Sequence, residues 1–417
     1  MNQIENTVKT VISGIGLVSS GGIGLEENFR NFTAKKSGIT TVTRFPMAPK
    51  VKTNIAGLIP NIPTSSLPQN VIERLCEDDL KQEYVKAAFL AAVEGIKDAD
   101  VAAKITENPR RTGLFVASSL GNFLFVSELV KDYFLDNLYK ITSLIHGMNS
   151  YLPARLASIF NIKGPCCFVS SSCTSSLNAI MQADRLIKCG MIDRAVIVGV
   201  DICLEMGTYH LWNKIRVLSH RNDDPTTACR PYCNTRDGMV VGEAAGCFIL
   251  EKESDCKSEY YAKIRGIGLS NGSSDFIRPT LEDITLAISD CMKDADSKPQ
   301  DIDFIAGSAS GSQVCDHFET EAVAALFGTE TERIPMFAFK SFIGTSFGVQ
   351  AISEGALALQ SFRTNKVPEV RNIFEHDPRV KSNVYYDHTK YSEYKMRKML
   401  FINHGFAGNH MAVVYER

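Results

Sequence analysis

The sequence repeats a group of short apolar segments in one order, and this repeat limits the folds that the chain can adopt. Residues 11–19 (VISGIGLVS) and 263–271 (KIRGIGLSN) share an isoleucine and the run Gly-Ile-Gly-Leu in register. Three more pairs follow in order: 111–122 with 301–312, 166–187 with 336–359, and 195–207 plus 242–251 with 398–417. Four matches in one order indicate duplication of a unit of about 200 residues. We therefore predict two similar halves, residues 1–255 and 256–417, with a functional site at their junction.

Each half alternates between strand-like and helix-like segments, which is typical of an α/β protein. Residues 195–200 are apolar throughout, as expected of a buried strand, whereas residues 82–99 have the amphipathic spacing of a helix that covers a sheet. With 44% hydrophobic and 22% charged residues, the chain can bury a large core. The predicted fold class is α/β with substantial buried sheet.

Composition and charge exclude several classes of function. Lys and Arg number 45 and Asp and Glu number 47, so the formal charge is −2, and binding to nucleic acid through bulk charge is not expected. The first residues, MNQIENTVKT, lack the apolar core of a signal peptide, and no apolar run reaches the length of a membrane span. We expect a cytoplasmic protein that binds no membrane. Its twelve cysteines should be thiols, and their spacing predicts no metal site.

Cys173 is the strongest candidate for a nucleophile. It lies in CCFVSSSCTSSLNAI (166–180), where a strand-like run turns through small residues into a helix that begins near Thr174. Backbone N–H groups and the dipole at a helix N-terminus favour thiolate, so we predict a lowered pKa for this thiol. The small serines around it permit a tight elbow and close approach of a substrate. The alternative is a buried structural cysteine in a serine-rich helix start.

A nucleophilic cysteine usually needs a base, and carbonyl chemistry needs hydrogen-bond donors for the oxyanion. Two of the eight histidines are candidates for the base: His317, beside Asp316 at the start of a helix, and His404, in a glycine-rich turn between apolar strands. We interpret the other six as structural or solvated: His146, His210, His220, His376, His388 and His410. The sequence alone pairs no histidine with Cys173.

Several segments together resemble the β-ketoacyl synthases, the ketosynthases of fatty-acid and polyketide assembly. In family order they are VISGIGLVSSGGIG (11–24), GPCCFVSSSCTSSLNAI (164–180), CRPYCNTRDGMVVGEAAGCFILE (229–251), ETEAVAALFG (319–328), KSFIG (340–344) and GFAGN (405–409). The resemblance covers nearly the whole chain. It implies a thiolase-type fold, with two similar α/β halves in an α-β-α-β-α arrangement around a buried site. It also implies a dimer formed through the first half, near the elbow strand.

The sequence departs from the family pattern at the two histidines that act with the cysteine in ketosynthases. The first stands eight residues before the aspartate that matches Asp316, and 316 − 8 gives Ser308. An alternative register gives Ser310, which is also not a histidine. The second stands five residues after the lysine that matches Lys340, and 340 + 5 gives Thr345. Neither serine nor threonine can take up a proton at neutral pH.

Other features of the family site are retained. Lys340, Asp316 and Glu319 match residues that support the site by charge and hydrogen bonding. The backbone N–H groups of Cys173 and Phe406 match the family's oxyanion donors. The resemblance therefore implies that Cys173 can still be acylated, while condensation lacks its histidines. Removing one oxyanion donor usually costs about 10²–10³ in rate.

By resemblance, this pattern implies a chain-length-factor-like subunit of a heterodimeric type II ketosynthase. Such a subunit shapes the tunnel for the growing chain and does not condense by itself. An alternative is a ketosynthase-like acyltransferase that uses Cys173 without malonyl decarboxylation, with His404 or His317 as base. A third possibility is an unrelated thiolase-fold binding or scaffold module.

The same resemblance implies two partners: an active ketosynthase homologue in a heterodimer, and an acyl carrier protein whose phosphopantetheine arm brings the substrate. It implies no tightly bound cofactor. Residues 129–149 should lie near the dimer interface and the tunnel.

Overall fold

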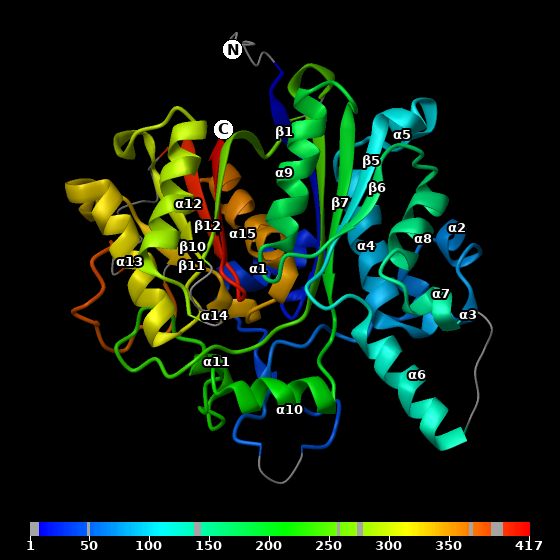
Figure 1. Ribbon diagram of the computed structural model, residues 1–417, viewed down its shortest axis with the longest axis horizontal. Helices are drawn as coiled ribbons and strands as arrows, with labels where there is room; N and C mark the ends of the chain where they lie inside the picture. The colour runs from blue at the N-terminus through cyan, green and yellow to red at the C-terminus, as the bar shows by residue number, and fades with distance from the viewer. Residues whose placement is uncertain are drawn as a thin grey trace.

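A sheet of eleven strands runs through the computed structural model, which describes residues 8–47, 51–136, 143–256, 259–272, 278–366, 370–384 and 395–417 (Figure 1). The strand order is β11-β10-β12-β13-β9-β1-β8-β7-β5-β6, and β2 pairs with β1 outside this order. The strands are β1 (Thr10–Ser19), β2 (Gly22–Ile23), β5 (Thr112–Ala117), β6 (Cys166–Val169), β7 (Arg194–Asp201), β8 (Ala244–Lys252), β9 (Ala262–Asn271), β10 (Phe304–Gly307), β11 (Met336–Ala338), β12 (Lys398–His404) and β13 (Asn409–Glu416). A small separate sheet joins β3 (Thr40–Thr41) to β4 (Ile55–Ala56).

The strand order repeats between the two halves. In the first half the order is β1-β8-β7-β5-β6, and in the second β9-β13-β12-β10-β11. The pairing directions match as well: β5 is parallel to β6 and β7, and β10 is parallel to β11 and β12, whereas the remaining pairs within each half are antiparallel. The prediction of two similar α/β halves is therefore confirmed. The boundary between residues 255 and 256 stays a prediction; residues 257–258 lie outside the described residues.

The repeated glycines let a helix lie close against the inner strand of each half. A Cβ atom on Gly16 of β1 would stand 2.0 Å from the carbonyl oxygen of Ala91 in α4 (Glu83–Asp98). A Cβ atom on Gly268 of β9 would stand 2.1 Å from the carbonyl oxygen of Ala287 in α12 (Leu281–Asp294). Only glycine permits such close approach of two backbones. The same packing requirement therefore explains the Gly-Ile-Gly run in both halves.

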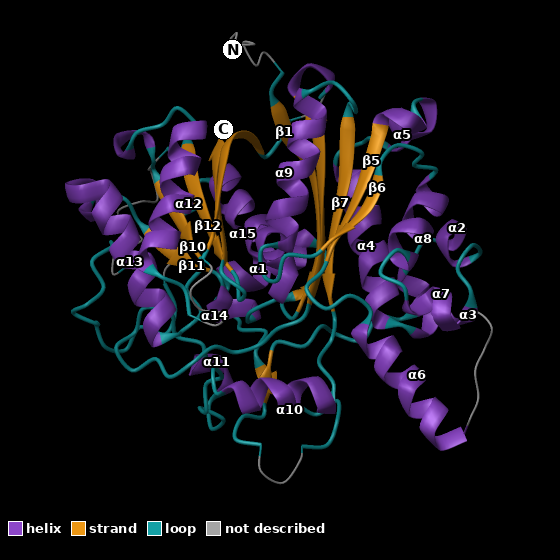
Figure 2. Cartoon of the chain, viewed as in Figure 1, coloured by secondary structure: helices purple, strands orange, loops and turns teal. Residues whose placement is uncertain are grey.

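The helices form three layers with the two halves of the sheet between them (Figure 2). The helices α4 and α8 (Tyr151–Phe160) pack on the first half, while α12 and α13 (Gln313–Phe327) lie on the far side of the second. Between the halves lie α9 (Ser175–Lys188) and α15 (Gln350–Thr364). This is the predicted α-β-α-β-α arrangement. Since α15 is buried along most of its length, the central layer is the core of the molecule.

The other helices lie around these layers and along the lower edge in Figure 1. They are α1 (Leu25–Thr33), α2 (Gln69–Ile72), α3 (Glu77–Lys81), α5 (Ala102–Glu107), α6 (Phe123–Asp136), α7 (Ser143–Gly147), α10 (Met206–Ile215), α11 (Pro225–Ala228) and α14 (Lys340–Ile343). Short 3₁₀ helices are η1 (Thr64–Ser66), η2 (Pro109–Arg111), η3 (Glu253–Asp255), η4 (Pro299–Asp301), η5 (Gly328–Glu332) and η6 (Phe347–Val349). Within the described ranges, no helix combines the length and apolar character needed to cross a membrane.

The two halves differ where a strand leads into a central helix. In the first half, β6 turns directly into α9. In the second, α14 and η6 come between β11 and α15, and the chain reverses at Gly344 and Phe347, which have φ of 77° and 50°. This longer connection supplies Lys340 and Thr345 to the junction.

Of the segment 129–149, residues 137–142 lie outside the described residues, and so does His388.

Candidate active site

Serine and threonine hydroxyls hold the elbow between β6 and α9. Ser172 has a left-handed φ of 56°, and Thr174 is the N-cap of α9. The Thr174 hydroxyl donates to the carbonyl oxygen of Ser171 at 2.7 Å, and the Ser175 hydroxyl accepts from the Ser171 N–H at 2.9 Å. These bonds satisfy the polar backbone of a tight turn. They fix Cys173, which is 4% exposed, just before the helix.

The predicted low pKa of Cys173 is wrong, because burial outweighs the groups that favour the thiolate. Removal from water raises the pKa of the thiol above its ordinary value. The backbone N–H of Phe406, the Ser172 hydroxyl and the charge of Lys340 act in the opposite direction. The resting form of Cys173 at neutral pH is therefore the thiol, so acylation needs a group that takes its proton.

One cavity of about 690 Å³ joins most of the predicted site residues at the junction of the two halves. Its lining includes Cys173, Ser308, Lys340, Thr345, His404 and Phe406. The cavity therefore contains the candidate nucleophile together with Ser308 and Thr345, the two residues that the sequence resemblance predicts at the histidine positions. The alternative position, Ser310, also lines it. Two lining residues that we did not predict are Gln350, which accepts from Asn403 at 2.9 Å, and His410.

Glu319 and Asp316 of α13 hold the loop that carries Ser308. The Glu319 carboxylate accepts the backbone N–H groups of Ser308 and Ala309, and Asp316 accepts those of Ser310 and Gly311. Both carboxylates are fully buried. Burial raises the pKa of Asp316 to about 6, against the opposing charge of Arg236. These two residues support the site from behind the cavity wall.

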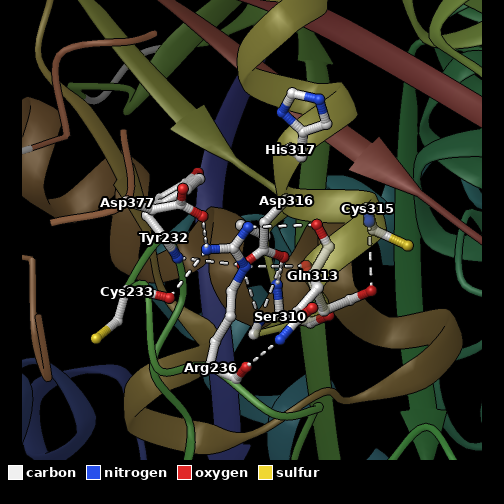
Figure 3. Close-up of polar contacts among 12 residues, drawn as sticks. Tyr232, Cys233, Arg236, Ser310, Gln313, Cys315, Asp316, His317 and Asp377 are labelled. Carbon is white, nitrogen blue, oxygen red and sulfur yellow. Dashed lines mark hydrogen bonds and ion pairs between the residues drawn. The ribbon is translucent and has the colours of Figure 1, made fainter. Parts of the chain in front are cut away.

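Arg236 ties three segments together behind this loop (Figure 3). Its guanidinium is fully buried, 3.6 Å from Asp316 and 2.6 Å from Asp377. It also donates to the backbone oxygens of Cys233 and Gln313. The segments 229–238, α13 and 370–384 are thereby joined through one side chain. A buried charge needs such partners, so this network fixes the back of the site.

Lys340 connects Ser308 to a further buried carboxylate, that of Glu354. Its Nζ donates to the carbonyl oxygen of Ser308 at 2.8 Å, to the Ser308 hydroxyl at 3.3 Å and to Glu354 at 3.1 Å. Burial raises the pKa of Glu354 to about 7, and Lys340 opposes this rise. The Ser308 hydroxyl also accepts the backbone N–H of His404 at 3.1 Å. In contrast, the Thr345 hydroxyl has no hydrogen-bond partner among the described residues.

The structure separates the two candidate bases. His404 lies in the cavity, with Nε2 3.3 Å from Glu319 and Nδ1 3.3 Å from Nδ1 of His410. His317 lies on α13, where its Nε2 is 3.2 Å from Glu321, and it is not among the described residues of the cavity wall. Figure 3 shows its ring turned away from Asp316 and Arg236. The interpretation of His410 as structural or solvated is wrong, because this buried residue lines the cavity.

Phe406 occupies the tight turn between β12 and β13. The turn requires left-handed backbone at Ala407 (φ 61°) and Gly408 (φ 72°). The ring of Phe406 lies 5.7 Å from that of Trp212 in α10, and Trp212 lies 5.0 Å from Phe347. This contact with Trp212 was not predicted, because α10 is distant in sequence. The aromatic group holds the turn whose N–H faces Cys173.

The chemical capacity of the site follows from these groups. It places a cysteine sulfur beside a backbone N–H donor in one cavity, a combination suited to attack on a carbonyl, and it has serine at position 308 and threonine at position 345. In the part of the chain that the structure describes, no three His, Cys, Asp or Glu side chains are grouped as metal ligands. A cysteine elbow at the N-terminus of a central helix, between two halves of equal strand order, defines a thiolase-type fold with a cysteine in its junction cavity.

Family models identify the chain more closely. The model of the β-ketoacyl synthase N-terminal domain matches residues 8–256, and that of the C-terminal domain matches residues 261–374. The chain therefore belongs to the β-ketoacyl synthase family. This membership excludes an unrelated thiolase-fold module.

Known proteins resemble the chain over nearly its full length. The oxytetracycline polyketide putative beta-ketoacyl synthase 1 of Streptomyces rimosus is 26% identical, over 91% of this chain and 90% of that protein. A type II polyketide synthase acyl-carrier protein in complex with its ketosynthase bound to the hexaketide (AntDE:AntF) has a similar chain, with a TM-score of 0.87 at 20% identity over 98% of this chain and 99% of that one. The ishigamide ketosynthase/chain length factor gives 0.84 at 20% identity, over 98% and 99%.

Proposed function

We propose that this chain is a chain-length-factor-like subunit of a heterodimeric type II ketosynthase. In this proposal it shapes the tunnel of the growing acyl chain and does not condense by itself. The observation that supports it is the wall of the Cys173 cavity, which includes Ser308 and Thr345, the residues that we assign to the positions of the family histidines.

The hydrogen bonds around Ser308 make it a poor substitute for a histidine. Its hydroxyl accepts from Lys340 and from the backbone of His404, so it is part of the scaffold. The Thr345 hydroxyl, which no described residue engages, can donate one neutral hydrogen bond but cannot exchange a proton at neutral pH. Two weakened donors, each usually worth about 10²–10³ in rate, are sufficient to remove condensing activity.

Features of the first half support a dimer partner. Strand β6 stands at the end of the sheet and is paired on one side only, with β5, among the described strands. On the same side of the molecule as β6 (Figure 1), α6 and α7 expose apolar side chains, including Val130 (50% exposed) and Leu144 (71%). An unpaired strand edge and exposed apolar side chains are both typical of an interface. The ishigamide ketosynthase/chain length factor carries both kinds of subunit in its name, which favours an active ketosynthase as partner.

An acyl carrier protein is the second proposed partner. In the AntDE:AntF structure, such a carrier is in complex with its ketosynthase. We expect the phosphopantetheine arm of the carrier to enter the 690 Å³ cavity and to reach Cys173.

The direct test is to purify the chain alone and with a ketosynthase that has the cysteine and both histidines. Alone, it should release no carbon dioxide from malonyl-carrier thioester above a Cys173→Ala control. Co-expressed, the two chains should purify in equal amounts. A homodimer with condensing turnover would show that the proposal is wrong.

A second candidate function is acyl transfer through Cys173. It is favoured by the position of the sulfur at the cavity wall, where the Phe406 N–H faces it. Intact-protein mass spectrometry with an acyl-carrier thioester tests this function. An adduct that Cys173→Ala abolishes, followed by transfer to an acceptor, supports it, and the absence of any adduct excludes it.

A further inference from the structure

Two histidines face each other across the hairpin that ends in the Phe406 turn. His404 of β12 and His410 of β13 are partners in the strand register. Their Nδ1 atoms are 3.3 Å apart, and both residues line the Cys173 cavity. Neither stands at a position where the resemblance to ketosynthases implies a histidine. The cavity therefore contains imidazole groups from a different element of the fold.

Glu319 extends this pair to three groups in a row. The Nε2 atom of His404 lies 3.3 Å from the Glu319 carboxylate, within ion-pair distance but without the geometry of a hydrogen bond, and its Nδ1 faces His410. At the other end, His410 is 1% exposed and its Nε2 has no hydrogen-bond partner among the described residues. The row thus runs from a buried carboxylate to an unpaired ring nitrogen of a cavity residue.

The positions of the protons on His404 and His410 determine whether the pair can accept another proton. Two facing Nδ1 atoms need one proton between them. When His404 carries its proton on Nε2, beside Glu319, and accepts Nδ1–H from His410, the Nε2 of His410 has a free lone pair. If that lone pair takes a proton and the Nδ1 proton moves to His404, the positive charge comes to lie beside Glu319. Burial and His404 lower the pKa of His410 to about 3, so His410 alone would hold such a proton poorly.

We propose that His410 and His404 form a proton relay that accepts the thiol proton of Cys173 when this cysteine is acylated. The β12–β13 turn, which joins the strands of the two histidines, packs against the Cys173 elbow. Gly405 follows His404 and packs on the elbow, where an added Cβ would lie 3.4 Å from the Cβ of Cys173. The next residue, Phe406, directs its N–H toward the sulfur. The inference rests on the second candidate function, acylation of Cys173, and does not depend on the heterodimer.

The step is balanced without any further reactant. The S–H bond of Cys173 breaks as its proton passes to Nε2 of His410, directly or through one water. The sulfur attacks the thioester carbonyl carbon, a new C–S bond forms, and the C–S bond to the carrier breaks. The leaving thiolate takes the proton back from Nε2, and the relay returns to its neutral state.

Several charged groups around the relay affect its pH dependence. Those on neighbouring elements and at the cavity wall are Glu319, Lys340, Glu354, Asp201, Asp237, Arg216 and Arg278. Glu354 has a raised pKa of about 7, so its titration falls in the neutral range and contributes to the measured pH profile. It is present in the wild type and in every relay variant, so differences between their pH profiles report the relay.

The test measures the acylation rate of Cys173 by an acyl N-acetylcysteamine thioester, using intact-protein mass spectrometry from acidic to alkaline pH. His410→Asn should slow acylation by about 10²-fold near neutral pH. The loss should shrink as the pH rises, because the thiol then ionises without help. His404→Gln should act in the same direction, and imidazole should restore part of the rate of His410→Ala.

His317→Asn is the matched control, since this histidine lies outside the cavity wall and should leave the rate unchanged. Fluorescence of Trp212, the single tryptophan, shows whether each variant keeps the fold around the turn. An unchanged rate and pH profile in folded His410→Asn and His404→Gln would overturn the relay. So would a wild-type protein that is never acylated, although the chain-length-factor proposal would then still stand. Condensing turnover by the chain alone would contradict that proposal and leave the relay intact.

Discussion

Lys340 is a buried cation in the cavity wall, and it binds both Ser308 and Glu354. It is 2% exposed and lies 3.0 Å from Glu354, which is 1% exposed. Removing one member of such a pair leaves a charge without compensation in the interior. The same side chain positions Ser308, so the loss also affects the site.

We predict that Lys340→Met lowers the free energy of unfolding by about 3–5 kcal/mol. The double variant Lys340→Met/Glu354→Met should lose less, because no unpaired charge remains. Urea denaturation of the three proteins measures both effects. Equal losses in the single and the double variant would contradict a buried ion pair.

The thiol of Cys173 gives a prediction of pH dependence. Since burial raises its pKa, the thiolate fraction at neutral pH is smaller than for an ordinary thiol of pKa 9.0. Alkylation by iodoacetamide should therefore be slow at neutral pH, and its rate should rise through a pH above this value. Peptide mass spectrometry follows the reaction at Cys173, with the exposed Cys189 as internal comparison. Fast alkylation at neutral pH would instead support the helix-dipole prediction.

At the scale of elements, the close approach of α4 to β1 and of α12 to β9 depends on glycine. We predict that Gly16→Ala and Gly268→Ala each lower the free energy of unfolding by about 1–3 kcal/mol, because each added Cβ meets a helix carbonyl. Gly147→Ala is the control, since its Cβ would have only an ordinary contact with Val126, at 3.5 Å. Thermal or urea unfolding measures all three. A loss in one half alone would contradict an equivalent packing role.

The sequence predicts these elements well because their signals are local. The Gly-Ile-Gly-Leu repeat and the apolar run 195–200 correspond to β1, β9 and β7, and the amphipathic run 82–99 corresponds to α4. The helix after Cys173 begins at Ser175, close to the expected residue. In the second half, however, the insertion of α14 and η6 depends on how Gly344 and Phe347 reverse the chain, which spacing does not indicate.

The parts of the site that sequence does not predict depend on contacts between distant elements. The role of His410 needs the β12–β13 register, which places it opposite His404. The GFAGN turn is visible in the sequence, and counting pairs outward from it would have suggested this contact. The pKa of Cys173 depends on its burial in the folded chain, which raises it more than the local groups lower it, so the local helix-dipole argument gives the wrong sign.

At the scale of the whole molecule, the exposed apolar side chains of α6 and α7 give a test of the proposed dimer. Val130→Asp and Leu144→Asp place charges on this surface and should prevent co-purification with the ketosynthase partner without lowering the melting temperature. Leu211→Asp, at an exposed leucine of α10, is the matched control and should leave pairing intact. Pairing that survives both interface variants would place the partner elsewhere.

The cavity of this chain is assembled from its own two halves, whereas in the proposed dimer the condensing residues belong to the partner. Within the chain, the halves bring Cys173 together with Ser308, Thr345 and Lys340 in one cavity. Between chains, we propose that the partner supplies the cysteine and two histidines that condense, while this chain shapes the tunnel. The absence of histidine at positions 308 and 345 is the sequence fact on which this assignment depends.

The most direct test inactivates one subunit of the reconstituted heterodimer at a time and measures condensation of acyl and malonyl carrier thioesters. With Cys173→Ala in this chain and an intact partner, we predict that condensation continues at a rate close to that of the unmodified heterodimer. With the nucleophilic cysteine of the partner replaced by alanine and this chain intact, we predict that condensation is lost. Turnover that survives in the second heterodimer and disappears in the first would contradict the account.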